Sequence, residues 1–279
     1  MTSPKRNLRA VTLVELVVSM GTMMLLTLFL FGIGIYASQA IRKTDDSSSV
    51  MAKLQLAYQQ LSQHMSEADA ILTQYPPTGS AVYRSDANST IILRVPVPNS
   101  SGVVLPGRYD VFIYTIEAAT GDSGPNIIKR YKGTITNNVG AAAVLDRNLA
   151  ASITTFAIDY GTTETFMGDQ SRKQFPLSAT PLAGSTEIPT LVMVGGTNRL
   201  ADGMASLSDS TVSFALAPRS NTPIDAHYRV DPQIPMDAFG KSGARYANVR
   251  LICRTTGEIR NSTFRNRDIE LNSRMSLRD

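Results

Sequence analysis

The chain has 279 residues, of which 43% are hydrophobic and 18% are charged, a balance that excludes a disordered protein and a protein made mostly of membrane helices. The formal net charge is +4, and Lys5, Arg6 and Arg9 supply three of these charges, so the rest of the chain is nearly neutral and gives weak support to nucleic-acid binding. A single cysteine, Cys253, excludes an intramolecular disulfide, and with only two histidines the sequence offers no Cys/His metal cluster.

An apolar run follows the basic N-terminus. Residues 16–41 contain no Asp, Glu, Lys or Arg. As a helix they would extend about 39 Å at 1.5 Å per residue, more than the roughly 30 Å of a bilayer hydrocarbon core. We therefore predict a membrane-spanning helix whose basic N-terminal flank stays in the cytoplasm, although Arg42 and Lys43 on the other flank weaken this asymmetry.

Two general interpretations of this run are open. A secretory signal peptide has an apolar core of about 7–15 residues, shorter than this run, although Ser38 and Ala40 offer a cleavage site of small residues. A plain signal anchor explains the length but not Glu15. A charge deep in the bilayer costs at least about 2.5–3.5 kcal/mol, and the cost is smaller near the cytoplasmic end, where Glu15 would lie.

A third interpretation rests on residues 5–16, which read KRNLRAVTLVEL. A basic leader, a small residue, then an apolar residue, threonine, two aliphatics, glutamate and leucine resemble the processing site of the type IV pilin family. Ala10 and Val11 stand where most members have glycine and phenylalanine. The resemblance implies that a leader of residues 1–10 is removed by a prepilin peptidase and that Val11 is N-methylated. The remaining residues of the implied processing motif are Thr12, Leu13, Val14, Glu15 and Leu16.

A physical argument gives Glu15 a role. Cleavage before Val11 would create an α-amino group, whose ordinary pKa is near 7.7–8.0. Opposite charges about 4 Å apart attract by roughly 4 kcal/mol at an effective dielectric of 20. A neighbouring subunit's amine would therefore offset the burial of Glu15, and we expect this carboxylate to set the register of subunit assembly.

Helical periodicity continues beyond the apolar run, over residues 42–73. The segment TDDSSS at 44–49 has poor helix propensity and is expected to loosen the helix. Tyr75-Pro76-Pro77 should end it, since proline cannot continue a helix. His64 is expected to be solvated or to cap the helix. A stripe at steps of three and four predicts packing against a sheet: Val50, Leu54, Ala57, Leu61, Met65, Ala68 and Leu72.

From residue 80 to residue 279 the pattern changes to short alternating segments bounded by turn residues. We expect long loops at 95–108, 161–187 and 217–245. The predicted strands are Thr90–Val95, Tyr109–Glu117, Ile127–Lys132, Ser152–Tyr160, Ile188–Val194, Thr211–Leu216 and Ala247–Arg254. The predicted fold class is α+β and pilin-like. A membrane half (11–41) and an amphipathic half (42–73) form one long helix, which packs on a C-terminal antiparallel β-sheet domain.

This layout also resembles minor pilins of the PilW type and the J-type minor pseudopilins of type II secretion. Segments such as DVFIYTIEA, ITTFAIDY and STFRNRD carry the likeness. It implies a single-pass protein of the cytoplasmic membrane that later enters a filament. The implied partners are the prepilin peptidase, other minor and major pilins, an inner-membrane assembly platform and membrane lipid. The predicted function is a minor pilin; a type II secretion pseudopilin, a DNA-uptake subunit and a membrane-anchored periplasmic binding domain are alternatives.

Motifs of catalysis are missing from the sequence. It contains no G-x-S-x-G, and neither His64 nor His227 lies in a Ser or Cys nucleophile motif, so we expect no enzyme, no metal and no cofactor. Cys253, within a predicted strand, is expected to be a buried structural thiol.

The C-terminal segment 245–279 is rich in arginine, with eight arginines against four acids. Arg260, Arg265 and Arg267 are candidates for contact with DNA. An ordinary salt-bridged surface is the alternative, and two aromatic residues in the segment, Tyr246 and Phe264, support base stacking poorly.

Overall fold

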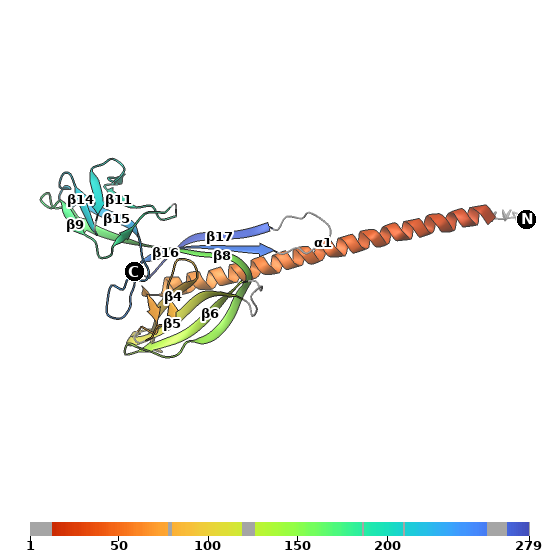
Figure 1. Ribbon diagram of the computed structural model, residues 1–279, viewed down its shortest axis with the longest axis horizontal. Coiled ribbons are helices and arrows are strands. Elements are labelled where there is room, and N and C mark those ends of the chain that lie inside the picture. The colour runs from red at the N-terminus through yellow and green to blue at the C-terminus, as the bar shows by residue number, and fades with distance from the viewer. Residues whose placement is uncertain are drawn as a thin grey trace, which may run out of the picture. The chain divides into compact units, whose positions relative to one another are not determined.

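The computed structural model describes residues 13–77, 80–118, 126–185, 187–208, 210–255 and 267–278 (Figure 1). The chain divides into two compact units, Met1–Ser49 and Val50–Asp279. One helix, α1 (Leu13–Glu67), precedes the β-strands, so the fold class is α+β, as predicted.

Helix α1 continues without a break where the sequence predicts loosening, and it ends earlier than the sequence predicts. Residues 44–49 are helical, so the loosening expected there is wrong. The helix ends at Glu67 and not near residue 73. The reason is tertiary: β1 (Ala70–Ile71) pairs with β4 (Thr90–Pro98), and Arg94 donates hydrogen bonds of 2.9 and 2.8 Å to the two carboxylate oxygens of Asp69. Sheet pairing thus ends the helix before the prolines are reached.

The predicted stripe lies in the core of the second unit. Leu54, Ala57, Leu61 and Met65 are buried on the helix, Val50 is half-buried, and Ala68 and Leu72 are buried just beyond the helix end. The stripe therefore packs as predicted, and each fully buried leucine contributes about 1.5–3 kcal/mol to folding.

An antiparallel sheet of twelve strands forms most of the second unit's described part. Its other strands are β5 (Val104–Ala118), β6 (Asn126–Thr136), β7 (Val139–Gly140), β8 (Val144–Met167), β10 (Pro181–Leu182), β11 (Leu191–Val194), β12 (Thr197–Asn198), β15 (Pro223–Val230), β16 (Tyr246–Thr255) and β17 (Arg267–Ser276). Two small sheets complete the described strands: β9 (Gln174–Pro176) with β13 (Ala205–Ser208) and β14 (Thr211–Phe214), and β2 (Gln74–Tyr75) with β3 (Tyr83–Arg84).

Strand β8 connects the parts of this sheet. Along its 24 residues it pairs first with β6, then with β16 and last with β15. Each of the seven predicted strands overlaps a strand of the structure, although Ile188–Val194 is a strand only from Leu191 onward and Thr211–Leu216 only as far as Phe214.

The three predicted long loops are wrong in part. Of residues 95–108 only 99–103 form the turn of a hairpin, because β4 runs to Pro98 and β5 begins at Val104. Within 161–187, β8 continues to Met167. Within 217–245 lies β15, where burial alternates strictly from Ile224 to Val230.

Gly161 marks the point at which β8 changes its neighbour from β16 to β15. A side-chain Cβ at this position would lie 2.4 Å from Cζ of Tyr246, which no real Cβ contact allows. The same tyrosine ring is stacked by Arg274, whose guanidinium carbon is 3.6 Å from the ring centroid. Glycine is therefore required here by the close approach of an aromatic ring.

We predict that Gly161→Ala lowers the free energy of unfolding by about 1–3 kcal/mol, the usual cost of forcing an extra carbon into a packed site. Urea titration of the detergent-solubilised full chain measures this. In a Tyr246→Ala background the added carbon meets no ring, so the same substitution should then cost much less. An equal cost in both backgrounds contradicts the prediction.

His64 is packed against the sheet, and the expectation of a solvated or capping side chain is wrong. Its ring stacks on Phe112, with centroids 3.6 Å apart and an interplanar angle of 16°. Its Nδ1 lies 2.7 Å from the hydroxyl of Tyr114. Burial, followed by the charge of Arg130, lowers the pKa of His64 to about 4.

The pKa of His64 predicts acid sensitivity of this packing. In the unfolded chain the pKa of His64 is near 6.5. Between pH 6.5 and about 4 the imidazole is therefore protonated in the unfolded state but neutral in the folded state. Stability is complete above pH 6.5 and falls as the pH is lowered through this window. Because the imidazole remains partly solvated, we expect a loss on the order of 1–2 kcal/mol, below the full value of the shift. His64→Gln should remove that part of the pH dependence in urea titrations, and identical pH profiles for the two chains contradict it.

Candidate functional site

The segment Glu15–Ser38 of α1 is long and apolar enough to cross a membrane. Its 24 residues would extend about 36 Å as a helix, and the hydrocarbon core of a bilayer measures about 30 Å. Every side chain in it is exposed, including large ones such as Phe29 and Phe31. Such a surface requires an apolar environment, either lipid or other protein helices.

The serine and threonine hydroxyls of this segment are satisfied within the helix. Ser19, Thr22, Thr27 and Ser38 each donate a hydrogen bond of 2.8–3.0 Å to a backbone carbonyl three or four residues earlier. Because hydrocarbon offers no hydrogen-bond partners, this arrangement lets the hydroxyls enter lipid without an unsatisfied polar group. The serine and threonine side chains of the segment are thus compatible with lipid, as its apolar side chains are.

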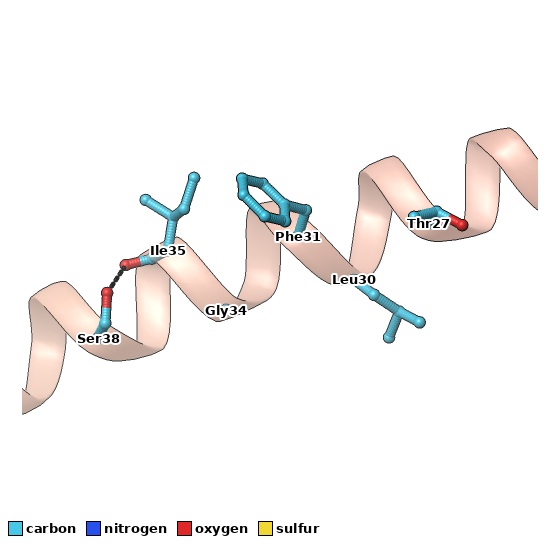
Figure 2. Close-up of a pocket in the computed structure, with 6 residues that line it drawn as sticks. All are labelled: Thr27, Leu30, Phe31, Gly34, Ile35 and Ser38. Carbon is cyan, nitrogen blue, oxygen red and sulfur yellow. Dashed lines mark hydrogen bonds between the residues drawn. The ribbon is translucent and has the colours of Figure 1, made fainter.

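Three glycines interrupt the apolar surface at Gly21, Gly32 and Gly34. A Cβ at any of them would meet nothing within 4 Å, so no contact in the described chain explains them. Glycine inside a helix costs about 1 kcal/mol relative to alanine. Figure 2 shows the bare backbone at Gly34, with Phe31 and Ile35 projecting to one side and Leu30 to the other. Small residues of this kind allow a second helix to approach closely in a membrane.

Glu15 lies in the first turn of α1 and is exposed. A carboxylate near the N-terminus of a helix interacts favourably with the helix dipole. It is also the one charged residue of the membrane-length segment, since residues 16–38 contain none. Any apolar environment around this segment must therefore accommodate one anion at its N-terminal end.

The other residues of the predicted processing site are described in part. Ala10, Val11 and Thr12 lie outside the described residues, and α1 begins at Leu13, followed by Val14. Leu16 is exposed beside Glu15. The structure therefore places Glu15 and Leu16 on the helix and leaves the cleavage site itself as a prediction.

The arginine-rich C-terminal segment contains ion pairs across two neighbouring strands. Arg250 of β16 donates to Glu270 of β17 at 2.7 Å, and Arg254 donates to Asp268 at 3.1 Å. These contacts favour the alternative of a salt-bridged surface for this part of the segment. Arg260 and Arg265 lie outside the described residues, and Arg267 is the first residue of β17.

The side chains of Cys253 and His227 make contacts within the folded sheet. Cys253 is a buried free thiol whose Sγ donates to the backbone oxygen of Ala151 at 3.4 Å, and burial raises its pKa, so the predicted structural thiol is confirmed. His227 contacts Thr163 through Nδ1 at 2.8 Å. Among the described residues, no three His, Cys, Asp or Glu side chains are grouped so that they could hold a metal ion.

The chain matches no protein-family model, no curated protein and no solved structure. The features of this chain that bear on function are its exposed apolar segment, the serine and threonine hydroxyls bonded to the helix backbone, and the single carboxylate of Glu15.

Proposed function

We propose that this protein is a minor pilin of the PilW type within the type IV pilin family. It would be a non-enzymatic, single-pass subunit of the cytoplasmic membrane that primes or joins a pilus-like filament. The observation that carries the proposal is the single carboxylate, Glu15, in the first turn of a helix that is uncharged through Ser38. A membrane anchor needs no charge there, whereas an assembly device does.

The proposed role of Glu15 follows from the cost of burying a charge. Removal of residues 1–10 by a prepilin peptidase would leave a positive α-amino group on Val11, and N-methylation would keep that charge. An amine of one subunit beside Glu15 of the next replaces water around both charges with a direct attraction of roughly 4 kcal/mol at 4 Å and an effective dielectric of 20. A subunit displaced along the filament would lose this pairing, so the carboxylate selects one axial position.

The rest of the segment supports a transfer from lipid to a bundle of helices. Both environments are apolar, and the serine and threonine hydroxyls already bond to the backbone of their own helix, so the transfer breaks none of these hydrogen bonds. Gly21, Gly32 and Gly34 leave room for neighbouring helices to approach. The second unit has its own core and would be displayed outside the membrane to meet other minor and major pilins and the assembly platform.

The first prediction from this proposal concerns processing. The protein purified from its native membrane should have the intact mass of residues 11–279 plus one methyl group. A plain anchored protein would retain residues 1–10, and cleavage by a signal peptidase after Ala40 would remove the whole apolar run. Either of these two masses contradicts the proposal.

A second prediction concerns Glu15. Glu15→Gln should leave membrane insertion unchanged but reduce incorporation into filaments at least about tenfold, since loss of 1.4 kcal/mol of the pairing suffices for that factor. Immunoblots of sheared filaments against membrane fractions measure it. Thr27→Val removes a hydroxyl from the same segment without touching a charge and should assemble normally. Normal incorporation of Glu15→Gln would refute the register role.

A further inference from the structure

Strand β17 forms a border of the large sheet. In the described part of the chain it pairs with β16 and with no other strand (Figure 1). Ten residues long, it is the longest strand with one open side among those that the pairings place at a border. An open strand border carries a row of backbone donors and acceptors, and such a row can be extended by a further strand.

The pairing pattern identifies the residues of the open side. Beyond the strand end, the backbone N–H of Leu277 donates to the oxygen of Arg245 at 2.9 Å, which continues the β16–β17 register. Because backbone groups alternate in direction along a strand, odd-numbered residues of β17 face β16 and even-numbered residues face outward. The outward residues are Asp268, Glu270, Asn272, Arg274 and Ser276.

These outward residues are complementary to themselves in reverse order. In an antiparallel pair of two β17 strands centred on Leu271, Asp268 lies opposite Arg274 of the second copy, and Arg274 lies opposite its Asp268. Glu270 lies opposite Asn272 in the same way. All four positions point their backbone groups outward, so these pairs would exchange about eight backbone hydrogen bonds. The same register thus brings Asp268 and Arg274 of the two copies together and forms the backbone hydrogen bonds between the two strands.

The second face of the strand adds an apolar contact. Ile269 and Leu271 are half-buried and pack against the core of the second unit. In the centred register Leu271 meets Leu271 of the other copy across the two-fold axis. Directly opposed apolar side chains in such a pair contribute about 0.2–1 kcal/mol beyond alanine.

We propose that two copies of this chain associate through antiparallel pairing of their β17 strands, with Leu271 on the two-fold axis. Charges along a strand border discourage pairing with foreign strands, and here Asp268 and Arg274 stand at positions that oppose each other when a second copy pairs antiparallel about Leu271. Asp268 binds Arg254 through Oδ1, so its Oδ2 is a further acceptor for the arginine of the other copy. This pairing does not depend on leader processing or on a filament.

Disulfide cross-linking in membranes that contain the full-length chain tests the pairing. Opposed residues on the axis have Cα atoms about 4.5 Å apart, which a disulfide can span, whereas the two Ser273 residues would be about 14 Å apart. Leu271→Cys should therefore form an oxidised dimer at least tenfold more than Ser273→Cys, an exposed position on the same strand. The native chain controls for Cys253, which is buried. Equal cross-linking at both positions overturns the proposal.

A charge exchange provides a second test. Arg274→Glu places an acidic side chain opposite Asp268 of the other copy, once at each end of the paired strands, and should reduce Leu271→Cys cross-linking several-fold. Adding Asp268→Arg restores opposite charges at these positions and should restore the cross-linking. Without any new cysteine, the native chain should sediment as a dimer in detergent and Arg274→Glu as a monomer. Thermal unfolding of each reduced variant confirms that it is folded. A dimer that is unchanged by Arg274→Glu overturns pairing through β17, since contacts of the membrane helix would then hold it.

Discussion

An apolar helix surface that carries a single anion constrains everything else in this protein. From Glu15 to Ser38 all side chains of α1 are exposed, so this segment requires lipid or other helices around it. The same helix continues into the second unit, where its buried stripe, including Leu54, Leu61 and Met65, becomes part of a folded core. One continuous helix thus belongs to two environments, and the change between them coincides with a change from uniform to one-sided hydrophobicity.

The anion gives this constraint its functional meaning. In a segment that only anchors the protein, Glu15 would raise the cost of insertion without adding apolar area, apart from its favourable interaction with the helix dipole. The serine and threonine hydroxyls of the segment bond to the helix backbone. Glu15 is the one charge that an apolar environment of this segment has to accommodate, and in the proposed filament the processed N-terminus of a neighbour would place a cation beside it.

Sequence patterns predicted the elements whose signal is local and strong. The uncharged run, the stripe from Val50 to Leu72 and the strands around Val111 and Val249 all follow from periodicity. The helix end was missed because the pairing of Ala70 with Arg94 is a long-range contact that overrides local propensity. Strand β15 was missed among turn residues, although its alternation of Ile224, Ala226, Tyr228 and Val230 was readable. In the candidate site, Glu15 could be identified from the sequence. The hydrogen bonds of the serine and threonine hydroxyls to the helix backbone could be seen only in the structure.

The border strand β17 shows why charge order matters more than charge amount. Its net charge is small, since Arg267 and Arg274 stand against Asp268 and Glu270, and bulk electrostatics would therefore predict indifference to a second copy. The order of these charges along the strand, however, distinguishes registers: centring on Leu271 opposes unlike charges, whereas centring on Glu270 opposes that glutamate to itself. Like charges directly opposite destabilise a strand pair. A polar border strand can therefore discourage general aggregation and still favour pairing with a second copy, provided that opposite charges, here Asp268 and Arg274, face each other in the antiparallel pair.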